Sequence, residues 1–74
     1  MSLDIAIRFG NAIRAIRRRA NISQEELAAR CGLHRTYVSD VELGKRNVSL
    51  ENIDRLACAL DISLVDLFEE VGNT

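Results

Sequence analysis

The stretch from Ser23 to Gly44 contains the start and stop signals of two short helices joined by a tight turn. Ser23 is followed three residues later by Glu26, a capping box in which the Ser oxygen accepts a backbone N–H of the first turn. Gly32 then ends this helix, because glycine adopts a left-handed backbone conformation without a steric penalty. A second helix over residues 35–43 is closed in the same way by Gly44. The spacing therefore predicts two short helices that cross closely.

Apolar residues occupy the positions where these two helices would meet. Ala28 is small enough for a close crossing, and Leu33 can fill the corner beside the turn. Val38 and Val41 would hold the second helix against the first. The outer side chains of the second helix are then left to face a partner. The predicted inner positions are Leu27, Ala28, Cys31, Leu33, Val38 and Val41.

Three further helices are predicted on either side of this pair. Apolar residues recur at steps of three and four over residues 4–19, which gives one apolar helix face. Ser49 and Ser63 are placed to cap a fourth helix and a short fifth helix. No alternation with period two extends far enough to indicate a strand. The expected fold class is all-α, a compact five-helix bundle forming a single domain over residues 1–74, with its core at about residues 5–70.

Charge is distributed unevenly along the chain, although the net charge is only −1. Residues 1–48 contain nine Arg or Lys against five Asp or Glu, whereas residues 49–74 contain one against six. A weakly negative total argues against a nucleic-acid partner, but this asymmetry is typical of a molecule with one phosphate-facing side. An uneven solvated surface would give the same count, so the pattern supports such a partner without establishing it.

Residue types that support other functions are scarce. No apolar run approaches the ~20 residues that span a bilayer, and no signal-peptide pattern is present, so we expect a cytoplasmic protein without a membrane partner. Cys31 and Cys58 are expected to be buried, reduced thiols, with a disulfide as the minor alternative. Cys31 and His34 have a metal-like spacing, but a structural zinc site needs four ligands. A single His without a partnered nucleophile gives no catalytic arrangement, so we expect no enzyme activity, metal, cofactor or small-molecule ligand.

The run SQEELAARCGLHRTYVSDVELGKRN resembles the helix-turn-helix of lambda-repressor-like (XRE-type) domains from bacteria and phages. Within that family, RTYVSDVE together with RNVSLENI is similar to the small controller proteins of restriction–modification systems. The resemblance extends over about residues 9–68. It implies a sequence-specific transcription regulator that binds double-stranded DNA. The alternatives are a phage-type repressor or antitoxin of the same fold, or a protein-interaction module that has lost DNA binding.

The resemblance places the helix over residues 35–43 in the DNA major groove. Arg35 would donate two hydrogen bonds to one guanine, a contact worth about 1–3 kcal/mol of discrimination. Without this motif, we would interpret Arg35 as an arginine at the start of a helix that is exposed to solvent. Asp40 is a departure, because a carboxylate accepts from cytosine but is repelled by phosphates, and it could instead pair with Arg35 or another neighbour. The expected base contacts are Arg35, Thr36, Ser39 and Asp40.

A second group of residues matches family positions near the DNA backbone, where contacts orient the protein without reading sequence. His34 occupies the cap position of its helix, where it would be either a weak cap or a phosphate contact. Arg46 could alternatively pair with a carboxylate of its own chain. The resemblance also implies an inward ion pair between Arg17 and Glu42, which we interpret as structural. The expected backbone contacts are Gln24, His34, Tyr37, Lys45, Arg46 and Asn47.

The C-terminal stretch is more apolar than one small domain can bury, and exposed apolar clusters mark interfaces. We expect Leu67 to face the core, while other apolar residues lie across the two-fold axis of a homodimer. The alternative is that these residues only close the core. Such a dimer would present two recognition helices about 34 Å apart, matching the half-sites of a palindromic operator. The expected interface residues are Val65, Phe68 and Val71.

Overall fold

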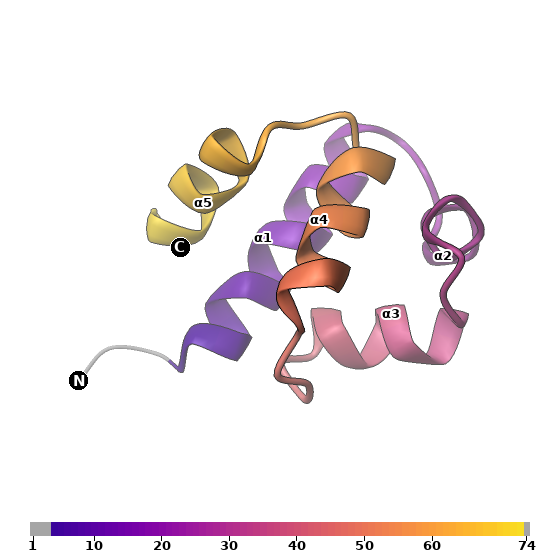
Figure 1. Cartoon of the computed structure of the whole chain (residues 1–74), viewed down its shortest axis with the longest axis horizontal. Coiled ribbons are helices and arrows are strands. Elements are labelled where there is room, and N and C mark those ends of the chain that lie inside the picture. The colour runs from indigo at the N-terminus through magenta and orange to yellow at the C-terminus, as the bar shows by residue number, and fades with distance from the viewer. Residues whose placement is uncertain (1–3, 74) are drawn as a thin grey trace.

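The computed structural model describes residues 4–73, which form five helices and no strand (Figure 1). The predicted all-α fold is confirmed, and every predicted helix is present with ends close to those expected. Residues 1–3 and 74 of the expected domain lie outside the described residues. No described helix is both long enough and apolar enough to cross a membrane. The helices are α1 (Ile5–Arg19), α2 (Gln24–Cys31), α3 (Arg35–Glu42), α4 (Leu50–Ala59) and α5 (Leu64–Gly72).

Serine side chains begin three of the helices. The Oγ atoms of Ser23, Ser49 and Ser63 accept the backbone N–H three residues further on, at 3.0, 3.1 and 3.0 Å. Each bond satisfies an N–H group that has no partner within the helix. α3 is different, because its N-cap residue, His34, makes no side-chain capping bond. Its start therefore depends on packing more than the starts of α2, α4 and α5 do.

Each of the four connections between helices contains one residue in the left-handed backbone conformation. Gly32 (φ 69°) and Gly44 (φ 76°) adopt the left-handed conformation that their positions predict. Asn21 (φ 61°) and Asp61 (φ 55°) adopt it as well, just after α1 and α4, where short polar side chains tolerate it better than most. In all four cases the next N–H bonds back to a carbonyl of the preceding helix, at 2.9–3.3 Å. The sharp chain reversals that place α2 and α3 are thus local in origin.

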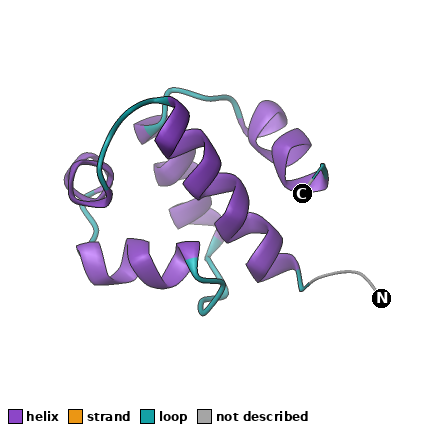
Figure 2. Ribbon diagram, turned by 180° about the vertical axis from the view of Figure 1, so that it is seen from behind, coloured by secondary structure: helices purple, strands orange, loops and turns teal. Residues whose placement is uncertain are grey.

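One buried cluster with members from all five helices forms the core. α1 packs against α3 and α5, while α2 packs against α3 and α4. Figure 2 shows α1 crossing the front of the molecule, with α2 and α3 to one side and α5 on the other. Leu67 lies in the core, as predicted. Each helix places a side chain with 0% exposure in the core, and examples from α1 to α5 in order are Ile13, Leu27, Val38, Leu56 and Leu67.

Two expectations about burial are wrong. Val71 is predicted at a dimer interface, but it is 2% exposed within this chain. It follows Leu67 by four residues, so both side chains lie on the inward face of α5. Cys58 is predicted to be buried, yet it is exposed, because α4 turns Ala57 inward and its neighbour outward. Cys31 is buried, and both cysteines are free thiols.

Candidate nucleic-acid interface

The outer face of α3 is exposed because its opposite face is anchored. Val38 and Val41 are 0% and 1% exposed, and α3 packs against both α1 and α2. The side chains of Arg35 and Thr36 are exposed on the other side of the helix. Where this outer face meets the start of α2, the surface forms a polar hollow. The hollow is lined by four of the sequence-predicted DNA contacts, Gln24, Arg35, Thr36 and Ser39.

A buried ion pair sets the position of α3 beside this hollow. Arg17 Nε lies 2.6 Å from Glu42 Oε2, and Arg17 Nη2 lies 3.0 Å from Glu42 Oε1. The third nitrogen of Arg17, Nη1, donates to the carbonyl oxygen of Ile22 at 2.9 Å. The hydrogen bond to Glu42 raises the pKa of Arg17 above its ordinary value. Arg17 and Glu42 thus form the pair that the resemblance implies, and it joins α1 to α3.

Gln24 takes part in the same network. Its amide Nε2 donates to Glu42 Oε1 at 3.0 Å, so Glu42 accepts from both α1 and α2. One N–H of the Gln24 amide group is used in this way, while the other makes no hydrogen bond within residues 4–73. The sequence predicts Gln24 only as a phosphate contact. The structure shows that its side chain is also oriented by Glu42.

Asp40 belongs to a second polar network on α3. Its Oδ2 lies 3.6 Å from Arg46 Nε, in the loop that follows the helix. The Arg46 guanidinium also sits over the Tyr37 ring, 5.2 Å from its centroid. Tyr37 Oη accepts a hydrogen bond from Asn52 Nδ2 of α4 at 3.1 Å. Asp40 therefore pairs with Arg46, not with Arg35, and sequence reasoning missed Asn52 because only tertiary packing brings it to Tyr37.

Two of the predicted contact residues are cations without a carboxylate partner. Arg35 and Lys45 are both exposed. Within residues 4–73, the ion pairs of the structure involve neither of them. His34 is exposed as well and makes no capping bond. All three side chains are thus exposed, so their polar atoms can contact a ligand.

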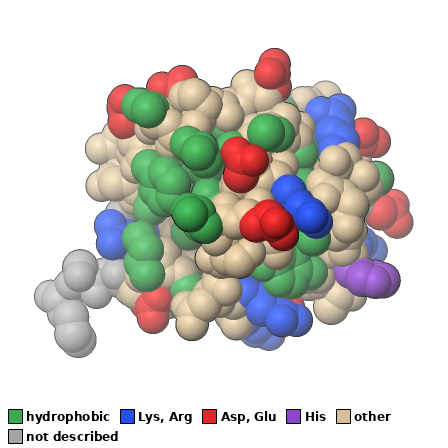
Figure 3. All heavy atoms as spheres, viewed as in Figure 1, with side chains coloured by type: hydrophobic (Ala, Val, Ile, Leu, Met, Phe, Trp, Pro, Cys, Tyr) green, Lys and Arg blue, Asp and Glu red, His purple; other side chains and the backbone are tan. Residues whose placement is uncertain are grey.

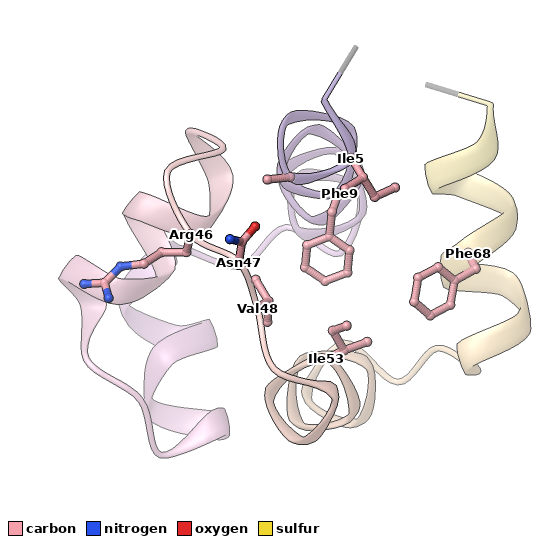
Figure 4. Close-up of a pocket in the computed structure, with 8 residues that line it drawn as sticks. Ile5, Phe9, Arg46, Asn47, Val48, Ile53 and Phe68 are labelled. Carbon is pink, nitrogen blue, oxygen red and sulfur yellow. The ribbon is translucent and has the colours of Figure 1, made fainter. Parts of the chain in front are cut away.

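An apolar hollow lies elsewhere on the molecule, between α1, α4 and α5. Figure 4 shows the rings of Phe9 and Phe68 on its two sides, with a centroid separation of 6.5 Å. Asn47 and Val48 of the α3–α4 loop also line it, whereas the Arg46 side chain extends away from it. Asn47 is therefore not brought together with the residues of the polar hollow. Figure 3 shows hydrophobic side chains gathered on one face of the molecule. Of the residues that line the hollow, Ile5 and Phe68 are exposed, and α5 also exposes Leu64 and Val65.

The two thiols lie at a third hollow, between α2 and α4. Cys31 Sγ approaches the Arg55 carbonyl oxygen at 3.7 Å, and burial raises the pKa of the Cys31 thiol. Cys58 Sγ lies 4.0 Å from Asp54 Oδ1 on the next turn of its own helix. Within the described part of the chain, no three His, Cys, Asp or Glu side chains are grouped as metal ligands would be. Neither thiol is therefore part of the α3 surface.

Known proteins share this arrangement. A family model described as helix-turn-helix matches residues 13–67. The chain is 49% identical over 76 aligned positions to Control protein C.BamHI from Bacillus amyloliquefaciens, covering 99% of this chain and 94% of that protein. The restriction–modification controller protein C.AhdI from Aeromonas hydrophila is 51% identical; its crystal structure superposes with a TM-score of 0.82 over 85% of this chain and 96% of its own.

A second similar structure contains DNA. The restriction–modification controller protein C.Esp1396I has been crystallised as a tetramer in complex with its natural 35 base-pair operator. It is 28% identical, with a TM-score of 0.90 over 97% of this chain and 95% of that chain. The region that the family model matches includes α2, α3 and all four residues of the polar hollow. The family consists of transcription regulators, not enzymes. This chain therefore belongs to the helix-turn-helix family of the lambda-repressor-like (XRE) type, alongside the control proteins of restriction–modification systems.

Proposed function

We propose that this chain is a sequence-specific transcription regulator that binds a palindromic operator as a homodimer and controls a restriction–modification system in the cytoplasm of its bacterial host. The observation that carries the proposal is the outer face of α3. Arg35 has no carboxylate partner among the described residues, while Val38 anchors the same helix in the core. A guanidinium held on a rigid helix can donate to O6 and N7 of one guanine in the major groove.

The charge of Asp40 is compatible with this function. A free carboxylate on the α3 surface would repel phosphates and would favour an interaction module that has lost DNA binding. Asp40 instead lies 3.6 Å from Arg46, which offsets its charge. Its side chain is 27% exposed, so Oδ atoms remain accessible to an amino group of cytosine. We therefore keep Asp40 among the base contacts, with Thr36 and Ser39.

The start of α2 and the loop after α3 provide the groups that we expect to contact the DNA backbone. The second amide N–H of Gln24 and the free N–H groups at the start of α2 can donate to one phosphate. Lys45 is exposed and can reach a neighbouring phosphate without breaking an ion pair within residues 4–73. We assign the other backbone contacts to His34, Tyr37, Arg46 and Asn47. These residues would orient the protein, leaving discrimination to α3.

The apolar face of α5 supports a homodimer. Val65 and Phe68 are 69% and 43% exposed, and Phe68 borders the apolar hollow of Figure 4. Large apolar side chains that remain this exposed in a small domain favour an interface with a second copy. Val71 is buried in its own chain and is left out of this interface. A two-fold axis here would place two α3 helices about 34 Å apart, one turn of DNA.

DNA binding is tested by selection from a pool of random duplexes at low salt. We expect the wild-type chain to enrich a palindrome whose half-sites are one turn apart. If no duplex is enriched, the chain is an interaction module and the proposal fails. Arg35→Ala should relax base preference at one position of each half-site, whereas Gln24→Ala should weaken binding to all duplexes alike. Arg55→Ala, on α4, is the matched control and should leave both properties unchanged.

The homodimer is tested by sedimentation equilibrium. Phe68→Asp places a charge on the proposed interface, so its mass should fall to that of a single chain. Leu43→Asp is the matched control, because Leu43 is also a large exposed apolar side chain (58%) but lies directly after α3, away from α5. It should keep the wild-type mass. An unchanged mass for Phe68→Asp would remove α5 from the interface.

A further inference from the structure

A second polar hollow lies beside the recognition helix, and two of the side chains that line it, Arg14 and Arg18, have no contact assigned so far. It is formed where α1, the start of α2 and the end of α3 meet. Gln24 and Ser39 line both this hollow and the one that contains Arg35, so the two are continuous. The α1 residues that line it are Arg14, Arg17 and Arg18.

Four of the five arginines of α1, all except Arg8, lie in its C-terminal half, and they divide into three groups by their partners. Arg17 forms an ion pair with Glu42, and Arg19 forms one with Glu70 of α5 at 2.9 Å. Arg14 and Arg18 are exposed, and none of the ion pairs formed within residues 4–73 includes them. The hollow therefore contains two positive charges that are not neutralised by the described part of the chain.

Helix stability does not account for both of these charges. A cation stabilises a helix through its dipole only within the last turn. Arg18 satisfies that condition, but α1 ends at Arg19, so Arg14 lies more than one turn earlier. The two side chains are four residues apart and thus lie on the same face of α1, separated along the axis by about 6 Å. They form a short basic ridge that leads into the groove of α3.

We propose that Arg14 and Arg18 bind two phosphodiester groups of the DNA strand that borders the recognition helix, so that α1 extends the DNA footprint. The inference rests on the proposed DNA-binding function. It assigns a role to this ridge because the hollow is continuous with the Arg35 surface and is positively charged, and phosphate is the complementary group on DNA. Such contacts add affinity and salt dependence but carry no base discrimination.

The test measures affinity for the selected operator duplex as a function of salt concentration. Arg14→Gln and Arg18→Gln should each reduce the slope of log K against log salt by ~0.9, and the double variant by about twice as much. If the two proteins bind equally at 1 M salt, a slope change of ~0.9 makes the variant bind roughly eightfold more weakly than the wild type at 0.1 M salt. The base preference of each variant should remain that of the wild type.

Two comparisons make the result decisive. Arg14→Lys and Arg18→Lys keep the charge and should keep the slope. Arg30→Gln and Arg55→Gln remove exposed arginines that border the α2–α4 hollow, and they should also keep it. A double Gln variant with the wild-type slope, or one with altered base preference, would overturn the inference. If the wild-type chain itself enriches no duplex, the failure belongs to the proposed function.

Discussion

Arg17 and Glu42 join α1 to α3 through two parallel hydrogen bonds of 2.6 and 3.0 Å. Their side chains are only 11% and 3% exposed. A charge pair this far removed from water costs about as much to desolvate as it gains by attraction, so it specifies geometry more than net stability. The geometry specified here is the position of the recognition helix against α1, and Gln24 connects α2 to the same carboxylate.

Breaking this pair should destabilise the fold strongly. Arg17→Ala leaves the Glu42 carboxylate buried with the Gln24 amide as its remaining partner, which should lower the free energy of unfolding by about 3 kcal/mol or more. Urea denaturation measures the change. The double variant Arg17→Met, Glu42→Leu should lose less, because no charge remains buried. A double variant that is as unstable as Arg17→Ala would contradict this account.

Gly10 should be indispensable to the contact of α1 with α3. A Cβ atom at this position would meet the carbonyl oxygen of Val41 and lie 2.8 Å from that of Glu42. These are backbone atoms that cannot turn away, so Gly10→Ala should destabilise the chain by about 1–3 kcal/mol. Gly72→Ala is the matched control, since nothing lies within 4 Å of its Cβ position in α5. Thermal melts in which both variants behave alike would refute the close approach.

Acid should weaken the link between α1 and α5. The hydrogen bond from Arg19 holds the pKa of Glu70 below its ordinary value. A carboxyl whose pKa is lowered on folding adds stability above its unfolded pKa and loses it as the pH falls through the folded one. Glu70→Gln should therefore be less stable than wild type at pH 7 and equal to it well below pH ~4.

The measurement is a series of urea midpoints from pH 7 to pH 3. Glu69→Gln, at the preceding exposed position of α5, controls for a general loss of negative charge. The effect should be small and should shrink at high salt, because Arg19 is 61% exposed. If the difference in urea midpoint between Glu70→Gln and the wild type grows as the pH falls, the predicted direction of the pH dependence is wrong.

The two thiols should differ in reactivity. Cys58 is exposed and should react with a disulfide reagent at the rate of an unfolded peptide thiol. Cys31 is buried and its pKa is raised, so its reaction should be slower by orders of magnitude and should accelerate in urea. Cys31→Ser and Cys58→Ser isolate the two rates. Rapid labelling of Cys31 in the native chain would mean that the α2–α4 contact opens readily.

The parts of the site that the sequence predicts depend on residues close together along the chain, whereas the parts it does not predict depend on contacts between distant segments. The polar hollow could be anticipated, because Arg35 and Thr36 lie on the outer face of a helix whose inner face is marked by Val38 and Val41. The pairing of Asp40 with Arg46 could not be chosen from sequence, since Arg35 was an equally available cation. The Tyr37–Asn52 bond, and the position of the basic ridge of α1 beside α3, require elements that are distant along the chain to be brought together.

The amino-acid sequence by itself determined where α2, α4 and α5 begin and where the chain turns. A Ser oxygen caps an N–H three residues away, and Gly32 or Gly44 takes a left-handed conformation without help from the rest of the molecule. Tertiary structure decided which way each helix is rotated about its axis. That rotation buries Val71 and exposes Cys58, and it turns both Arg35 and Arg18 to the α3 surface, because it is fixed by contacts between helices that the local sequence does not contain.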